Sequence, residues 1–145
     1  MDVRFKIATL EDVADIVNLC NECFEESTSL EYAYDTFKKT MNSDEHIYIV
    51  GTIDGKIVSH AKITIIPTMY ENMNTYAILN HVCVKKEYRR HNIATDMLNF
   101  ITGICKEQKC KTIELWSNNY REAAHACYKK YGFMVNDAKF FSKDI

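Results

Sequence analysis

The sequence predicts an α/β domain of the mixed α+β kind, with a twisted, mostly antiparallel sheet of about six to seven strands flanked by about four helices. Segments with apolar residues at alternate positions are interspersed with segments whose apolar residues recur every three or four positions. These are the periods of strands and of helices. Three strand-like segments follow one another, which favours antiparallel pairing, and one strand–helix–strand unit over residues 77–116 favours a single parallel pair.

The N-terminal half is expected to contain three strands and two helices. Thr9, with Asp12 three residues later, has the form of a capping box and predicts a helix start. Asp54-Gly55 lies between two apolar segments and is a strong hairpin signal. The expected elements are a strand at Val3–Ala8, helices ending near Phe24 and Met41, and strands at His46–Thr52 and Lys56–Ile66.

The C-terminal half is expected to alternate strands and helices. β-Branched residues at Ile78, Val82 and Val84 favour a buried strand. Gly132 is expected to end the last helix. The expected elements are a strand at Thr75–Val84, a helix from Asn92 to about Gln108, a strand at Thr112–Trp116, a helix from about Tyr120 to Tyr131, and closing strands at Phe133–Val135 and Ala138–Ser142.

The composition bounds the function classes. A length of 145 residues with 47% hydrophobic residues suits one domain, residues 1–145, with a substantial core. A net charge of −2 argues against a general affinity for nucleic acid or for an anionic membrane. There is no long apolar stretch and no N-terminal signal pattern, so we expect a cytoplasmic protein that binds neither membrane nor nucleic acid.

The six cysteines are scattered along the chain. Cys20-x-x-Cys23 allows a zinc or redox interpretation, but no second matching pair with a nearby histidine follows. Both residues fall on the apolar face of an expected helix. We therefore favour small core residues in a reducing compartment and expect no metal site.

The segment Val82–Ala94 has the order strand, basic turn, helix. The first turn of a helix has backbone N–H groups without intrahelical partners and a partial positive charge. A basic turn leading into it is a good seat for a phosphate or pyrophosphate, although a solvated turn is the alternative. The basic residues are Lys85, Lys86, Arg89, Arg90 and His91.

Two motifs resemble the GNAT superfamily of N-acetyltransferases. Arg89-Arg90-His91-Asn92-Ile93-Ala94 resembles the signature (Gln/Arg)-x-x-Gly-x-(Gly/Ala), and Ser117–Phe133 resembles the closing segment with a tyrosine, three residues and Gly-Phe. One departure is Asn92 in place of the central glycine. Aminoalkylphosphonate acetyltransferases share it, together with a pattern similar to Arg121–Tyr128.

The resemblance implies an acetyl-coenzyme A-dependent acyltransferase (EC 2.3.1.-) with the GNAT fold, in which the parallel strand pair splays apart to hold the cofactor. Main-chain groups of the strand and the turn would bind the pantetheine and the pyrophosphate, and polar residues after the fifth strand would orient the acetyl group. Asn118 and Asn119 have turn and helix capping as the alternative, and the role of Arg121 stays open. The implied cofactor-binding residues are Val82, Cys83, Val84, Arg89, Arg90, His91, Asn92, Ile93, Ala94, Thr95, Asn118, Asn119, Arg121 and Tyr128.

Tyr128 matches the tyrosine of the closing motif and is our candidate proton donor to the leaving thiolate. The alternative is a core tyrosine, because Tyr128 lies on an apolar helical stripe. For the base we favour His81, with Asn80 beside it, since histidine exchanges protons near neutral pH. His60, Glu71 and a water chain are the alternatives.

By analogy with the family, the acceptor site lies between the N-terminal helices and the loop before the splayed strand. Acidic residues there would attract a cationic amine, with a solvated helix face as the alternative. The candidate acceptor residues are Glu22, Glu26, Tyr32, Tyr70 and Glu71.

We therefore expect acetyl transfer to a primary amine of a small molecule, directly within a ternary complex. Acetylation of a protein N-terminus or lysine is one alternative. A non-catalytic acyl-coenzyme A sensor is an alternative of another class. Assembly into a homodimer stays open.

Overall fold

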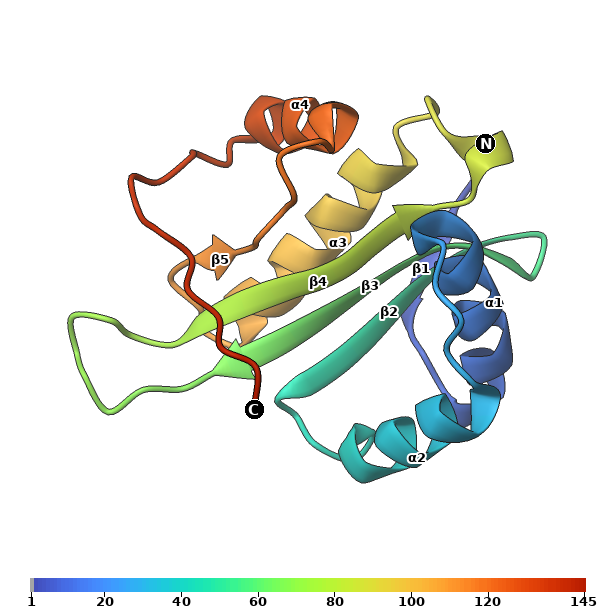
Figure 1. The fold of residues 1–145 in the computed structure, drawn as a ribbon, viewed down its shortest axis with the longest axis horizontal. Coiled ribbons are helices and arrows are strands. Elements are labelled where there is room, and N and C mark those ends of the chain that lie inside the picture. The colour runs from blue at the N-terminus through green and yellow to red at the C-terminus, as the bar shows by residue number, and fades with distance from the viewer. Residues whose placement is uncertain (1) are drawn as a thin grey trace.

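In the computed structural model, which describes residues 2–145, five strands form one sheet in the order β1-β2-β3-β4-β5 (Figure 1). The first three pairs are antiparallel and the pair of β4 with β5 is parallel, so the mixed sheet is confirmed. The strands are β1 (Arg4–Ile7), β2 (His46–Ile53), β3 (Lys56–Ile66), β4 (Tyr76–Val84) and β5 (Ile113–Glu114).

Four α-helices cover the two faces of this sheet, as predicted (Figure 1). α1 and α2 pack on one face through residues such as Ile16 and Phe37, and α3 covers the other. α4 lies beside α3, where the Tyr131 hydroxyl donates to Asn99 Oδ1 at 2.8 Å. The helices are α1 (Val13–Phe24), α2 (Leu30–Thr40), α3 (Ile93–Glu107) and α4 (Glu122–Tyr131).

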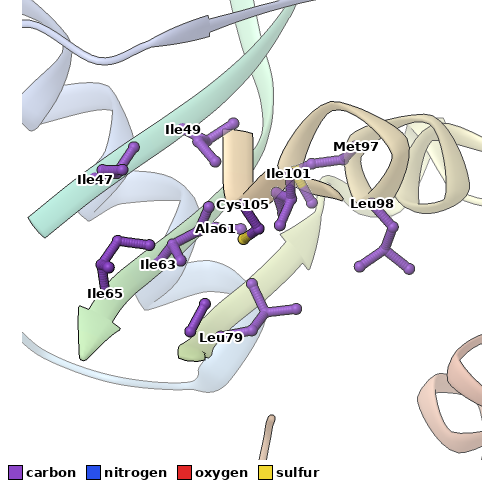
Figure 2. Packing of buried hydrophobic residues seen from close by; sticks show 11 residues of the cluster. Ile47, Ile49, Ala61, Ile63, Ile65, Leu79, Met97, Leu98, Ile101 and Cys105 are labelled. Atoms are coloured by element: carbon purple, nitrogen blue, oxygen red, sulfur yellow. The ribbon is translucent and has the colours of Figure 1, made fainter. Parts of the chain in front are cut away.

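The core between α3 and the sheet holds β4 in place. The α3 side chains of Met97 and Ile101 are fully buried in one cluster with Ile63 of β3 and Leu79 of β4 (Figure 2). Burial of each such side chain stabilises the fold by about 1.5–3 kcal/mol. This packing fixes the position of the strand that borders the site.

Two local signals read from the sequence have the expected geometry. The Thr9 backbone N–H donates to Asp12 Oδ2 at 2.9 Å, so the capping box is formed, and a 3₁₀ turn at Leu10–Asp12 leads into α1. Asp54 and Gly55 both have positive φ, of 49° and 78°, as a tight two-residue hairpin requires.

The closing strands predicted at Phe133–Val135 and Ala138–Ser142 are wrong, since neither segment is a strand in the structure. β5 has two residues, so it offers almost no edge on which a further strand can pair. The side chains after α4 remain exposed, 82% for Met134 and 85% for Phe141. Both segments contain aromatic residues, which favour strands, but a strand also needs a partner with free hydrogen-bonding groups.

The last part of β4 is an open edge. β5 pairs with β4 at Ala77 and Ile78, and within the described chain nothing pairs with this edge from Leu79 to Val84. A register irregularity between His60 and Lys62 coincides with His81 in the left-handed region, at φ 53°. An extra residue of this kind bends a strand and increases its twist, and so carries β4 away from β5.

His60 is a buried polar residue of β3, opposite Cys83. Its Nδ1 donates to the Ile49 carbonyl at 2.8 Å, a bond that by itself favours the charged ring and only partly opposes the effect of burial. Burial lowers the pKa of His60 to about 4 from an ordinary value of 6.5. Buried and hydrogen-bonded in this way, His60 is poorly placed to act as a base on a ligand.

The first prediction concerns stability against pH. Because the folded pKa lies below the unfolded one, stability from His60 is complete above pH 6.5 and is lost as the pH falls towards 4. We expect the free energy of unfolding to fall by about 2 kcal/mol from this residue between pH 7 and pH 5. Urea unfolding of wild type, His60→Gln and the exposed control His91→Gln tests this. An equally steep pH dependence in His60→Gln and in the control contradicts the prediction.

Candidate active site

A cavity of about 590 Å³ opens beside the uncovered edge of β4. The end of α1, strand β4, the segment after β5, helix α4 and the C-terminal segment contribute its walls. Eight of the residues singled out from the sequence come together here, namely Glu26, Asn80, His81, Val82, Asn118, Asn119, Arg121 and Tyr128.

A second cavity of about 440 Å³ lies next to the first and shares Phe24 and Arg121 with it. Glu22 and Arg89, both singled out from the sequence, line this second cavity rather than the first. Lys86 adds a further positive charge. Two adjacent cavities therefore lie near the C-terminal end of β4.

The turn between β4 and α3 has the backbone of an anion site. Arg90 and Asn92 both have left-handed backbones, with φ of 66° and 61°. Asn92 is the N-cap of α3, and no side chain caps this helix end. When residues with left-handed and right-handed backbones alternate, their successive N–H groups point towards one place and can bind an anion. The dipole of the helix favours negative charge at the same place.

The left-handed backbone explains the residue at position 92. Glycine adopts this conformation most readily, and asparagine is among the few other residues that tolerate it. Ile93 is 2% exposed, so its side chain belongs to the core and only its main chain is available to a ligand. The turn places backbone groups of Arg90, His91, Asn92, Ile93, Ala94 and Thr95 together, outside the walls of both cavities.

The open edge of β4 presents main-chain groups at alternate residues. Lys85 N–H donates to the Val58 carbonyl of β3 at 2.7 Å, so Lys85 and Cys83 face β3 while Val84 faces the open edge. The Val84 carbonyl accepts a hydrogen bond from Arg89 Nε at 2.9 Å. The main chain of Cys83, predicted to bind the cofactor, is therefore directed towards β3.

A histidine–carboxylate pair lies in the wall of the larger cavity. His81 Nε2 is 3.5 Å from Glu26 Oε1, which belongs to the loop after α1. The ring of Phe24 packs edge-on against the imidazole at 5.2 Å between centroids. The pair thus joins a base candidate on β4 to a carboxylate that the sequence assigned to the acceptor side.

Two tyrosines of α4 differ in what their hydroxyls contact. The Tyr131 hydroxyl bonds Asn99 and lies 3.1 Å from Thr102 Oγ1, so this residue ties α4 to α3. The Tyr128 hydroxyl has no hydrogen-bond partner among residues 2–145, and Tyr128 lines the cavity. Burial raises the pKa of Tyr128 to about 12, so the phenol stays protonated at neutral pH.

The segment between β5 and α4 forms a turn that faces the cavity. Arg121 N–H donates to the Asn118 carbonyl at 3.0 Å, and α4 begins without a side-chain cap. The carboxamides of Asn118 and Asn119 are therefore not helix caps. The Arg121 guanidinium stacks 5.0 Å from the centre of the Phe24 ring and so bridges α4 to α1.

Three predicted acceptor residues lie elsewhere. Tyr32 is 71% exposed on α2, and Tyr70 and Glu71 belong to the exposed loop between β3 and β4. None of the three lines either cavity. Their assignment relied on analogy with the family for the N-terminal helices and the loop before the splayed strand, which does not determine where these side chains lie in this chain.

The structure adds wall residues that the sequence did not single out. Ser117 Oγ lies 3.0 Å from His125 Nε2, and Trp116 packs against Phe140 at 5.7 Å between ring centroids. Trp116 is the one tryptophan in the chain and lies two residues after the end of β5, which was a usable signal. Phe140 gave no such signal. The additional residues include Phe24, Leu115, Trp116, Ser117, Ala124 and Phe140.

Among residues 2–145, no three His, Cys, Asp or Glu side chains gather closely enough to hold a metal ion. Among the described helices, none combines the length and apolarity that a membrane crossing needs.

Residues 13–133 match the model of the family described as "Acetyltransferase (GNAT) family". This match includes the basic turn, the open edge of β4 and all of α4.

Solved structures of similar fold have low sequence identity to this chain. A predicted acetyltransferase from Clostridium acetobutylicum, solved with acetyl-CoA, is 18% identical at a TM-score of 0.81, over 98% of this chain and 96% of that one. Glucosamine-6-phosphate N-acetyltransferase from Arabidopsis thaliana is 18% identical at 0.82, over 99% of each chain. A transcriptional regulator from Bacillus halodurans is 18% identical at 0.90, over 99% and 100%.

Proposed function

The chain belongs to the acetyltransferase (GNAT) family, and we propose that it transfers the acetyl group of acetyl-coenzyme A to the primary amine of a small molecule. Acetyl-coenzyme A is the acetyl donor. The observation that carries the acceptor proposal is the larger cavity, in which an unpartnered tyrosine hydroxyl and a histidine–carboxylate pair flank an open strand edge. We further propose that residues 1–145 act as one domain.

For the donor, the left-handed turn and the start of α3 hold the pyrophosphate through main-chain N–H groups. The pantetheine follows the open edge of β4 at Val82 and Val84. Asn118 and Asn119, whose carboxamides do not cap α4, orient the thioester carbonyl from the other side of the gap.

The chemistry assigned to the cavity is a direct transfer in a ternary complex. His81, with Glu26 against its ring, takes a proton from the acceptor amine. The amine nitrogen attacks the thioester carbonyl carbon, and the carbon–sulfur bond then breaks. The departing thiolate is stabilised by the Tyr128 hydroxyl, which is protonated and free to donate.

For the acceptor, the cavity volume of about 590 Å³ falls within the range of small-ligand sites. Glu26 in its wall favours an acceptor that carries positive charge. This volume favours a small molecule over a long peptide, which would need an open groove. Aminoalkylphosphonates are one acceptor class to test, on the pattern from Arg121 to Tyr128.

We also propose that the chain forms a homodimer. The exposed apolar side chains after α4, which include Met134 and Phe141, support this assembly, because large apolar groups are usually covered. Light scattering during gel filtration tests the proposal, and a monomer mass at micromolar concentration counts against it.

The general test is thiol release from acetyl-coenzyme A across an amine panel. The panel contains polyamines, aminoglycosides, aminoalkylphosphonates and short peptides, and we expect turnover with at least one small amine. Turnover with peptides alone favours protein acetylation. Tight acetyl-coenzyme A binding without thiol release from any amine favours an acyl-coenzyme A sensor.

A second prediction concerns the turn that is proposed to bind the pyrophosphate of acetyl-coenzyme A. Asn92→Gly keeps wild-type affinity for acetyl-coenzyme A, because glycine adopts the left-handed backbone freely. Asn92→Ala weakens binding by about tenfold, since that conformation costs other L-residues about 1–2 kcal/mol. Calorimetric titration measures both affinities.

Asn74→Ala is the matched control for Asn92→Ala. Asn74 has the same left-handed backbone, at φ 56°, but lies in the loop between β3 and β4. The control should lose stability and keep its affinity. Equal affinity losses at positions 74 and 92 would show that the effect is not local to the turn.

A third prediction separates the two tyrosines of α4. Tyr128→Phe lowers kcat by about 100-fold, because the leaving thiolate loses its hydrogen-bond donor. Tyr131→Phe keeps kcat within about twofold and lowers the melting temperature, because its hydroxyl bonds Asn99 and Thr102. Steady-state kinetics and thermal unfolding of both variants decide the matter. An unchanged kcat in Tyr128→Phe removes the assigned role.

A fourth prediction concerns the histidine–carboxylate pair. His81→Gln lowers kcat by about 100-fold and Glu26→Gln by about tenfold, because Glu26 acts through the ring that it contacts. If Glu26 serves only to attract the amine, Glu26→Gln will instead raise KM and leave kcat unchanged. The split between kcat and KM therefore distinguishes a positioning role from charge attraction.

A further inference from the structure

We propose that Cys23 is a peroxide-reactive thiol that forms a disulfide with Cys83 and thereby weakens the binding of acetyl-coenzyme A. Cys23 lies at the end of α1 and Cys83 on β4. The disulfide itself is independent of the proposed function. Its effect on the donor rests on that function.

The first support is the contact between Cys23 and the basic turn. Arg89 Nη2 donates to Cys23 Sγ at 3.8 Å, while Arg89 Nε donates to the Val84 carbonyl at 2.9 Å. As a thiol, Cys23 also donates to the Val84 carbonyl, at 3.7 Å. One sulfur atom thus connects α1, the open edge of β4 and the turn assigned to the pyrophosphate.

The second support is access together with positive charge. Cys23 lines the smaller cavity of about 440 Å³, where Lys86, Arg89 and Arg121 face the carboxylates of Glu22 and Glu25. A molecule as small as hydrogen peroxide fits this space. Reactive cysteines occur in such partly exposed, electropositive surroundings, whereas buried structural cysteines are inert.

The third support is a neighbouring thiol on a different element. The Cys83 side chain is 5% exposed, and Cys83 directly precedes Val84, whose carbonyl lies 3.7 Å from Cys23 Sγ. Cys20 and Cys23 lie three residues apart on α1, so they share one face of the helix. Cys23 is the member of this group that lines a cavity, so an oxidant reaches it first.

The electrostatics agree with this geometry. The hydrogen bond from Cys83 and then the contacts with Arg89 lower the pKa of Cys23 to about 6, against the opposing effects of burial and of Glu22. Cys23 is therefore mainly a thiolate at neutral pH. Burial raises the pKa of Cys105 to about 12 and also raises that of Cys110, so these two remain protonated.

The oxidation has two balanced steps. The Cys23 thiolate attacks one oxygen of hydrogen peroxide, the O–O bond breaks, and hydroxide leaves to take up a proton as water. The Cys83 sulfur then attacks the sulfenic sulfur of Cys23. The S–O bond breaks, and the hydroxyl leaves with the Cys83 proton as a second water. Two thiols lose two electrons and one peroxide is reduced.

The consequence for the donor site follows from the lost contacts. A disulfide at Cys23 carries no negative charge, so Arg89 loses the anionic sulfur that it contacts. Arg89 begins the turn whose left-handed backbone forms the proposed pyrophosphate seat. Oxidation therefore weakens donor binding without any change in the cavity that holds the acceptor.

The test uses the full chain, first reduced and then treated with one equivalent of hydrogen peroxide. Peptide mapping by mass spectrometry should find a Cys23–Cys83 disulfide in wild type and in the control Cys110→Ser. In Cys83→Ser, a sulfenic-acid trapping reagent should label Cys23. Arg89→Met should slow this oxidation by about tenfold, because the thiolate loses its cation.

Calorimetry on the same samples measures the coupling. The oxidised protein should bind acetyl-coenzyme A about tenfold more weakly, or about 1.4 kcal/mol, and a reductant should restore the affinity. If no disulfide forms, or if Cys110 is oxidised as fast as Cys23, the proposal that Cys23 is the reactive thiol is wrong. A disulfide with unchanged affinity overturns the coupling. If the reduced protein binds no acetyl-coenzyme A, the proposed function fails while the mass spectra still decide the disulfide.

Discussion

The structure depends on the separation of β4 from β5. The two strands pair at Ala77 and Ile78, and the extra residue near His81 then turns β4 away. On the β5 side, the main-chain groups of β4 beyond this point have no strand partner within the described chain, although unpaired backbone groups are costly to bury. A fold keeps such an edge when something else supplies the hydrogen bonds. The cavities, the basic turn and the catalytic candidates all lie along this edge.

The hydrophobic core stabilises β4 although one of its edges is unpaired. Met97 and Ile101 of α3 pack against the sheet in a cluster that includes Leu79 of β4, so this face of β4 is held in place (Figure 2). The same helix presents its uncapped N-terminus at the end of the open edge. One helix therefore supplies both the core packing and the proposed pyrophosphate site.

The site is assembled from contacts between distant segments. Phe24 packs against His81 and lies under the Arg121 guanidinium, so the end of α1 touches both strand β4 and the start of α4. Cys23, the preceding residue, contacts Arg89. A change at the end of α1 therefore reaches the proposed acceptor side through Phe24 and Glu26 and the proposed donor side through Cys23. Through these contacts, a modification at the end of α1 can affect both parts of the proposed site.

The sequence by itself determined the local features. The capping box at Thr9, the hairpin at Asp54-Gly55, the helical faces and the strand–turn–helix order around Asn92 each depend on residues close together in the chain, and the structure has all of them. Tertiary structure decided the rest. The closing strands lack a partner edge, Tyr70 and Glu71 lie away from the cavities, and Cys23 meets Arg89 across 66 residues. Strand pairing and side-chain convergence depend on where other segments fold, and the periodicity of one segment carries no information about that.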